Sequence, residues 1–397
     1  MPPALIWHSR TAWVTIYDMN PFSKSWIPGF PHRLWRKQSG VIPLLSLVPI
    51  ILACVLPTTA DDVRDRQIAE TMLLFQRSTG GWPKNYDETH RPTAQESRKI
   101  LSERNRRDST FDNGATHSEM RHLAKVYRQT GDERYKQAFL QGLEFVLAAQ
   151  YANGGWPQYH PNASGYYVHV TFNDDAMIGV MRLLRDIDRV DPDFLFVTPT
   201  DRERCRTAVD KGVQCILKCQ IVVDGHKTAW CAQHDSRTLA PAKARSYELP
   251  SLSGSESVGI TRFLMEIEPP TPEIIEAIQG AVAWFDEAKL TGIKVIRKPD
   301  PSTPKGWDKV VINDPSAPPL WARFYRIGDN QPIFCSRDGV PKQNLAEISY
   351  ERRNGYSWLG NRPASLLAKD YPVWQSKWAP DVNVLKGGRI GPSKVEN

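Results

Sequence analysis

Four clusters of polar and charged residues fall at predicted loops and helix starts, not on apolar helix faces. Two of them combine carboxylates with asparagine, and the other two carry arginine beside aromatic residues. Paired carboxylates could serve as a general acid and base, and a local group of arginines could bind an anionic substrate. The clusters are Phe111–Thr116, Phe172–Met177, Arg245–Gly254, and the C-terminal stretches Trp321–Tyr325 and Arg337–Gly339.

An internal repeat predicts how these clusters are positioned. Gly80-Gly81-Trp82-Pro83-Lys84 recurs as Gly154-Gly155-Trp156-Pro157-Gln158, and Trp230 follows Trp156 at the offset that separates Trp156 from Trp82. Each unit has the same order: an apolar-periodic helix, a glutamine, a glycine turn, a tryptophan, a loop and a second helix. Glycine in the turn can adopt the left-handed backbone that ends the first helix.

Hydrophobic periodicity places six helices in three hairpins. The first helices of the units are predicted at Gln67–Arg77, Arg134–Tyr151 and Asp201–Gln220. The second helices are predicted at Ala115–Gln129, Asp175–Asp188 and Ser255–Glu266. Repeated hairpins of this kind stack around an axis, so the sequence predicts an α-helical toroid. Stacking brings the starts of the second helices to one end, where we expect four side chains to converge: Asp112, Asn113, Asp174 and Arg245.

Helix capping is the alternative interpretation of the acidic clusters. Asp and Asn are favoured at the N-cap, where the side chain accepts a hydrogen bond from a free backbone N–H. Asp112, Asn173 and Asp174 all stand close to a predicted helix start. Capping and a shared site both remain open for these residues.

The C-terminal part is predicted to be less regular. Residues 273–290 form one more amphipathic helix, and Lys298–Leu320, rich in Pro, Asp and Lys, is predicted to be a long loop. The stretch Trp321–Gly360 alternates aromatics with arginines and short turns, which favours irregular structure and short strands. The tail from about Ala379 is predicted to be poorly ordered.

The first 60 residues are typical of an export leader. Arg33, Arg36 and Lys37 precede the uncharged stretch Gln38–Ala60, which ends in small residues. Basic, apolar and small-residue regions in this order predict a secretory signal, so the protein is expected to be secreted or periplasmic. Translation could also start at Met19, and Ile51–Cys54 resembles a lipoprotein cleavage box, so a lipid anchor at Cys54 is an open alternative. Three prolines in the apolar stretch disfavour a stable membrane-spanning helix.

Charge and cysteine content argue against three other classes of protein: nucleic-acid-binding proteins, zinc proteins and disulfide scaffolds. The leader holds five basic residues and one acid, so it accounts for +4 of the net charge of +7 and leaves +3 for the remainder, too little to argue for a nucleic-acid partner. The five cysteines after the leader lack the spacing of a zinc site and are too few and odd in number for a disulfide scaffold. We expect buried thiols, with one bridge possible, at Cys205, Cys215, Cys219, Cys231 and Cys335.

Four segments of the chain resemble polysaccharide lyase family 10, the pectate lyases with an (α/α)3 toroid. They are Thr110–Tyr127, Gly154–Met181, Ala244–Ser257 and Trp321–Tyr356, and the resemblance extends over roughly residues 61–375. The run Ala-Arg-Ser-Tyr-Glu-Leu-Pro-Ser-Leu-Ser-Gly at 244–254 is its most specific part. The implied organisation is an extension plus signal peptide over 1–60, one catalytic domain over 61–378 and a tail over 379–397.

The resemblance implies calcium-assisted β-elimination of α-1,4-polygalacturonate, leaving a 4,5-unsaturated product. Arg245 matches the base that removes the C5 proton, with Lys243 as the reserve candidate. Asp112, Asn113 and Asp174 match the calcium and subsite residues. Asp175 stands where many relatives have an uncharged residue. The calcium ligand expected at Asp174 could therefore be shared with Asp175 or shifted to it. The expected substrate-binding residues are Lys243, Tyr247, Arg323, Arg337 and Asp175.

Physical chemistry sets conditions on these roles. Calcium takes six to eight oxygen ligands, which two Asp and one Asn cannot supply, so weak binding is expected without substrate. An arginine base is expensive to deprotonate, by roughly 5 kcal/mol at pH 9, so activity should rise toward alkaline pH. Neighbouring Arg323, Arg337 and Lys243 are expected to lower the pKa of Arg245. A purely structural pair between Arg245 and Glu248 is the competing interpretation.

Two other functions fit parts of the pattern. A glycoside hydrolase could use Asp112 and Asp174 as acid and base, and it would give saturated product ends without calcium. A non-catalytic pectin-binding protein would keep its function after replacement of Arg245. In each case the expected partner is an acidic polysaccharide, and a monomer is expected.

Overall fold

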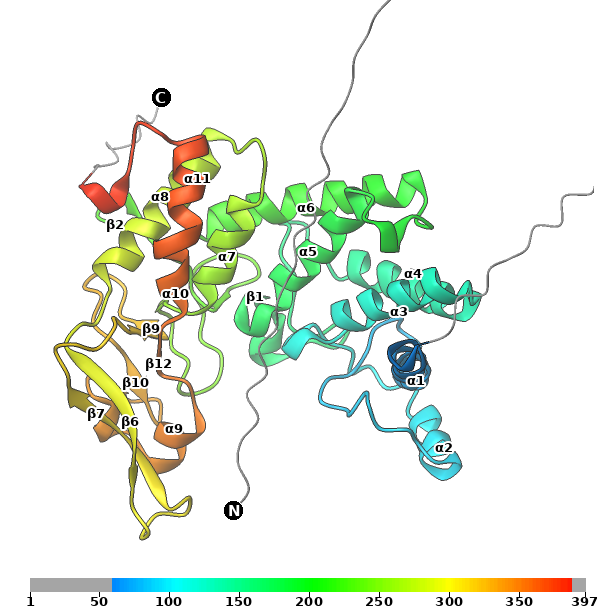
Figure 1. The fold of residues 1–397 in the computed structure, drawn as a ribbon, viewed down its shortest axis with the longest axis horizontal. Coiled ribbons are helices and arrows are strands. Elements are labelled where there is room, and N and C mark those ends of the chain that lie inside the picture. The colour runs from blue at the N-terminus through cyan, green and yellow to red at the C-terminus, as the bar shows by residue number, and fades with distance from the viewer. Residues whose placement is uncertain (1–58, 388–397) are drawn as a thin grey trace, which may run out of the picture. The chain divides into compact units, whose positions relative to one another are not determined.

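Helices are the dominant secondary structure of the described chain, residues 59–387 of a computed structural model (Figure 1). The first helices of the repeats are α1 (Ala60–Phe75), α4 (Glu133–Ala148) and α6 (Pro199–Cys219), followed by α8 (Pro272–Glu287). The second helices are α3 (His117–Thr130), α5 (Ala176–Asp188) and α7 (Glu256–Met265). All six predicted hairpin helices and the helix predicted at 273–290 are therefore confirmed, with ends that differ by a few residues except at α1, which starts earlier.

The helices pack in two rows that follow chain order. The outer row runs α1, α4, α6 and α8, and the inner row runs α3, α5 and α7. Each inner helix also packs on its outer neighbour, as in α3 on α4 and α5 on α6. Figure 1 shows α1 and α8 at opposite ends of this arrangement, so the predicted toroid of hairpins is present as an open arc and not as a closed barrel.

The glutamine and tryptophan of each repeat fix one unit to the next. The side-chain amide of Gln76 donates to the carbonyl of Gly80 in its own turn and to Ala138 of α4, both at 2.8 Å. Gln150 does the same to Gly154 and Ala208, and Gln220 to Thr228 and Ala277. The indole N–H of each tryptophan donates to a carbonyl of the preceding helix; the donors are Trp82, Trp156 and Trp230. These bonds satisfy polar groups that would otherwise be buried without partners.

Two segments of the C-terminal part have a structure that differs from the sequence prediction. The predicted loop Lys298–Leu320 is wrong in part, because β6 (Ile293–Pro299) and β7 (Trp307–Asn313) pair as an antiparallel hairpin. The β-branched run Val310-Val311-Ile312 favours a strand in β7, whereas the Pro-rich turn between the strands dominated the composition. The predicted poor order of the tail is wrong up to Gly387, because η7 (Val384–Lys386) packs on α8.

Five short strand pairs of the described residues link the loops. The pairs are β1 (Val170–Thr171) with β4 (Gln233–His234), β2 (Val222–Val223) with β3 (His226–Lys227), β5 (Leu252–Ser253) with β9 (Phe324–Tyr325), β8 (Trp321–Ala322) with β12 (Leu359–Gly360), and β10 (Phe334–Cys335) with β11 (Pro341–Lys342). Three of them, β1–β4, β5–β9 and β8–β12, join segments that lie far apart in the sequence. The remaining helices are α2 (Ala94–Ser102), α9 (Tyr350–Gly355), α10 (Arg362–Ser365) and α11 (Tyr371–Trp378). The β5–β9 pair matters most for the site, because it joins the 245–254 run to the segment that carries Arg323.

Residues 1–58 lie outside the described part of the chain, and so do the predictions of a signal peptide and of a lipid anchor at Cys54. Among residues 59–387, no helix has the length and apolar character needed to cross a bilayer. The five cysteines of this part are free and buried, which confirms the buried thiols and gives no bridge between them.

Candidate active site

Two short 3₁₀ turns, η1 (Asp112–Gly114) and η3 (Asn173–Asp175), lie side by side at the starts of α3 and α5. Their backbones match, because Asn113 and Asp174 both adopt left-handed conformations, with φ of 54° and 50°. Asp112 is therefore the repeat equivalent of Asn173, and Asn113 that of Asp174. The N-caps of α3 and α5 are Thr116 and Asp175, and neither makes a side-chain capping bond. The capping interpretation is thus wrong for Asp112, Asn173 and Asp174.

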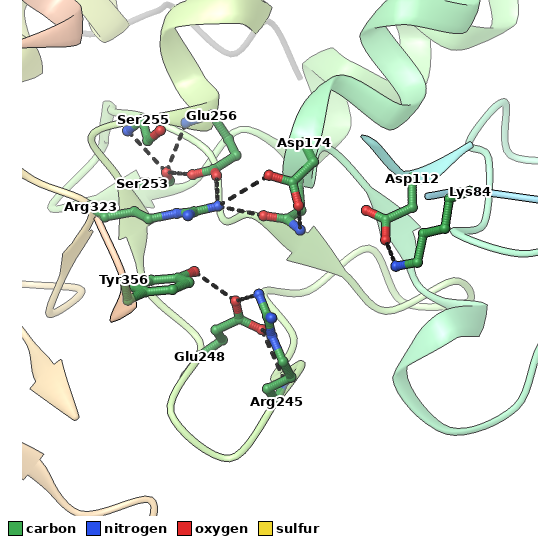
Figure 2. A network of polar contacts seen from close by, with 11 residues as sticks. Lys84, Asp112, Asp174, Arg245, Glu248, Ser253, Ser255, Glu256, Arg323 and Tyr356 are labelled. Atoms are coloured by element: carbon green, nitrogen blue, oxygen red, sulfur yellow. Dashed lines mark hydrogen bonds and ion pairs between the residues drawn. The ribbon is translucent and has the colours of Figure 1, made fainter. Parts of the chain in front are cut away.

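Asp112 is a buried carboxylate with one partner. Its side chain is 4% exposed, and Oδ2 forms an ion pair with the ammonium of Lys84. Oδ1 has no hydrogen-bond partner within residues 59–387. In Figure 2 the carboxylate lies between Lys84 and Asp174. A buried oxygen of this kind is costly unless it meets a cation or a donor, so Asp112 is suited to accept a further ligand.

Asp174 lies at the centre of the cluster. Its side chain is 40% exposed, Oδ2 accepts a 2.7 Å hydrogen bond from the Asn173 amide, and Oδ1 lies 3.8 Å from Nη2 of Arg323. Burial raises its pKa, and Arg323 partly offsets that effect. Figure 2 shows Asp112 and Arg245 around Asp174, and their charges also act on its pKa, Asp112 upward and Arg245 downward.

Arg323 is held from three sides. Its guanidinium is 11% exposed, donates to Oδ1 of Asn173 at 2.6 Å, and pairs with Glu256 at the start of α7. Glu256 in turn accepts from the hydroxyl of Ser253 on β5. Burial acts to lower the pKa of Arg323, but the charges of Glu256 and Asp174, the phenol of Tyr356 and the hydrogen bond to Glu256 together outweigh it, and the net shift is upward. Arg323 is therefore a fixed cation facing Asp174.

Arg245 forms a paired fork with Glu248. Nε of Arg245 donates to Oε2 of Glu248 at 2.7 Å, and Nη2 donates to Oε1. The hydroxyl of Tyr356 donates to the same Oε1 at 2.7 Å (Figure 2). Burial acts to lower the pKa of Arg245, yet the bonds to Glu248 raise it overall. The expected lowering of this pKa by neighbouring cations is wrong for this arrangement, because a carboxylate lies closer than any of them.

The remaining predicted residues surround this centre. Arg337 is exposed and pairs with Glu351 at 3.1 Å, and Lys243 is exposed beside it near Gly339. Tyr247 is buried beneath three guanidinium groups, whose carbons lie 4.6–5.8 Å from its ring centre; they belong to Arg245, Arg337 and Arg352. This position favours support of the arginines over direct contact with a ligand.

Asn113 and Asp175 point to other partners. The amide of Asn113 donates to Oδ1 of Asn85 at 3.0 Å, and the residue is exposed. Asp175 lies 3.6 Å from Arg182 of α5, and burial raises its pKa. Neither contacts the Asp112–Asp174 pair through a hydrogen bond or ion pair of the described residues.

Several members of the cluster were not predicted as site residues. Lys84 and Asn173 belong to the repeated motifs, so the comparison of the two repeats could have found them. Glu256 follows the recognised 245–254 run, and Glu248 was considered only as a structural partner. Tyr356 reaches the site through tertiary contacts that carry no local sequence signal.

The side chains of this arrangement could supply some, but not all, of the oxygen ligands of a hard cation. Within the described residues, no group of three His, Cys, Asp or Glu side chains is placed to bind a metal. The available oxygens come from Asp112 and Asp174, so a ligand carboxylate and water would have to complete the shell of a calcium ion.

Comparisons with known proteins identify the family of this chain. A family model described as pectic acid lyase matches residues 76–367, whereas no curated protein matches the chain. Two solved structures of a family 10 polysaccharide lyase from Cellvibrio cellulosa are similar. One, an alanine mutant in complex with trigalacturonic acid, is 35% identical with a TM-score of 0.68, over 80% of this chain and 95% of that one. The other is 34% identical with a TM-score of 0.66, over 81% and 96%. The chain therefore belongs to polysaccharide lyase family 10, the pectic acid lyases.

Proposed function

We propose that this lyase cleaves α-1,4-polygalacturonate by calcium-assisted β-elimination, with Arg245 as the base. The observation that carries the proposal is the meeting of Asp112, Asp174, Arg323 and Arg245 in one site. The trigalacturonic acid bound to the similar Cellvibrio lyase supports an oligogalacturonate as ligand. Export through the predicted leader and action as a monomer belong to the same proposal.

The reaction needs a base, a cation and a leaving-group path. A base removes the proton from C5 of a uronate ring, the electron pair forms the C4–C5 double bond, and the C4–O4 bond breaks. The departing oxygen takes a proton from water. Membership of a lyase family sets aside the hydrolase and the non-catalytic interpretations, and an unsaturated product end is the chemical mark that separates elimination from hydrolysis.

Asp112 and Asp174 would hold the calcium ion. Its chemistry would be to draw charge from the uronate carboxylate and thereby acidify the neighbouring C5 proton. The free oxygen of Asp112 and the half-exposed carboxylate of Asp174 fit such a ligand. Arg323 would orient the substrate carboxylate from the other side of Asp174, and exposed Arg337 and Lys243 would attract more distant uronates.

Arg245 can accept a proton only after it leaves Glu248. The pair keeps the guanidinium protonated, because it raises the pKa of Arg245. A base role therefore requires that the pair open when substrate binds and that the pH be alkaline. Glu248 is itself held by Tyr356, so it can stay in place while Arg245 moves.

Replacement of Arg245 tests the base role. Arg245→Ala should lower turnover by at least about 100-fold, the usual size of a general-base contribution, while trigalacturonate binding measured by calorimetry changes little. Arg337→Ala is the matched control and should weaken binding more than it lowers kcat. Turnover is followed as absorbance of the unsaturated product. Full activity in the Arg245 variant would place the base elsewhere.

Glu248→Gln provides a second, sharper test. Loss of the carboxylate should lower the pKa of Arg245 in the free enzyme, so the pH at which kcat/KM rises should move to a lower value. A profile with the wild-type midpoint would show that Arg245 does not titrate in the reaction.

A further inference from the structure

Lys84 pairs with Asp112, a carboxylate that the proposed calcium site would use. The residue directly follows the Gly80–Pro83 turn, whose Trp82 is fully buried, so its backbone is fixed. Its ammonium forms an ion pair with Oδ2 of Asp112 and lies 5.7 Å above the ring centre of Tyr159. The other oxygen, Oδ1, has no partner within residues 59–387. The carboxylate is thus only half satisfied.

The second repeat shows that the fold itself does not need this ion pair. The backbone N–H groups of Thr110 and Thr171 donate to the carbonyls of Trp82 and Trp156, at 3.0 and 3.1 Å, which fixes the register of the two repeats. In that register Gln158 stands for Lys84 and Asn173 stands for Asp112. The same backbone therefore carries a charged pair in the first repeat and two neutral amides in the second.

Electrostatics makes Lys84 and a bound divalent cation competitors. Like charges within a few ångströms repel strongly where solvent is partly excluded, so the ammonium must move when a cation reaches Asp112. Its side chain is 27% exposed and flexible, which leaves it free to turn outward. Once displaced, its charge lacks a partner until an anion arrives, and a uronate carboxylate is such an anion.

We propose that Lys84 is an internal counter-ion that keeps Asp112 from calcium until a uronate carboxylate is present, and so couples metal binding to substrate binding. The inference rests on the proposed calcium site at Asp112 and Asp174. Because coupling between two ligands is reciprocal, each should tighten the binding of the other. Lys84 is a positioning residue in this scheme, acting through Asp112.

The test is calorimetric titration of calcium in the Arg245→Ala background, with and without trigalacturonate. Lys84→Gln, which copies the residue of the second repeat, should raise the substrate-free calcium affinity about tenfold, equal to about 1.4 kcal/mol. It should also reduce the gain in calcium affinity that trigalacturonate provides. Lys227→Gln, which removes a similar pair with Glu276, should leave both values unchanged. An unchanged or weaker calcium affinity in Lys84→Gln overturns the proposal.

Asp112→Asn separates this failure from a failure of the metal site. If Asp112→Asn leaves calcium affinity intact, the proposed calcium site is wrong. If Asp112→Asn weakens calcium while Lys84→Gln does not strengthen it, only the counter-ion role fails. A measurement that needs no Lys84 variant is the thermal midpoint of the Arg245→Ala protein. Calcium and trigalacturonate together should raise it by more than the sum of their separate effects, and a merely additive response contradicts the coupling.

Discussion

At the residue scale, the charged groups of the site form ion pairs with one another. Lys84 pairs with Asp112, Arg323 with Glu256 and Arg245 with Glu248. Breaking a buried pair by removing one partner costs far more than the pair contributes. A substrate with several carboxylates, together with a divalent cation, can exchange partners with these groups without leaving any of them alone.

Glu119 offers a pH test outside this cluster. Burial raises its pKa to about 7, and Tyr86 donates a 2.9 Å hydrogen bond to it. Because the folded pKa is above the unfolded value, its stabilising effect is complete below about pH 4.5 and is lost as pH rises through 7. Glu119→Gln should therefore gain about 3 kcal/mol relative to wild type between pH 4.5 and 8.

Urea unfolding at several pH values measures this gain. Glu203→Gln, on the exposed face of α6, should follow wild type across the same range. A constant difference between Glu119→Gln and wild type at every pH would contradict a raised pKa at this position.

At the element scale, the repeat turns join neighbouring hairpins by close backbone approach. Gly154 has φ of +92°, and a Cβ atom there would lie 2.0 Å from the carbonyl oxygen of Lys211 in α6. Gly80 makes the equivalent approach to Gln141 of α4, at 2.3 Å. Only glycine meets both the backbone conformation and the contact, which is why the motif recurs.

Gly154→Ala should destabilise the protein by about 3 kcal/mol or more, since the strain of the left-handed backbone adds to an overpacked contact. Gly165→Ala is the matched control, because φ there is +57° but no atom lies within 4 Å of the added Cβ. Its cost should be about 1 kcal/mol. Equal losses in the two denaturation midpoints would refute the importance of the contact.

The same turns explain how much the sequence could predict. Helices and their stacking follow from local periodicity and the repeat. The sequence could therefore predict α3–α8 and the proximity of Asp112, Asp174 and Arg245. The sequence did not predict the β6–β7 hairpin, and it left the pair of Arg245 with Glu248 as one of two interpretations. The first was hidden by the composition of its turn, and the second depends on Tyr356, which folds back from a distant segment to hold Glu248.

At the scale of the whole molecule, the C-terminal segment returns to the helical rows. The buried hydroxyl of Tyr371 donates to Oε1 of Gln279 in α8 at 2.8 Å and accepts from the N–H of Val384 at 3.1 Å. Gln279 also donates to the carbonyl of Val382 at 3.0 Å. This small network fastens η7 and α11 onto the last outer helix.

Tyr371→Phe should lower the free energy of unfolding by about 1–3 kcal/mol, because it leaves the buried amide oxygen of Gln279 and the partly buried N–H of Val384 without this partner. Tyr127→Phe removes a hydroxyl that only bonds the exposed Glu133, and it should change stability by less than about 0.5 kcal/mol. Urea midpoints for the two variants give the comparison. If Tyr371→Phe matches Tyr127→Phe, the network does not fasten the segment.

The five buried thiols of the described residues allow local unfolding to be measured by their chemical reactivity. A thiol-reactive label can reach Cys205, Cys215, Cys219, Cys231 or Cys335 only when the surrounding packing has parted. Labelling rates measured for each cysteine-containing peptide would then compare how often the third hairpin and the C-terminal strand region unfold locally. No engineered cysteine is needed. The native cysteines of this pectic acid lyase can therefore report the rates of its local unfolding.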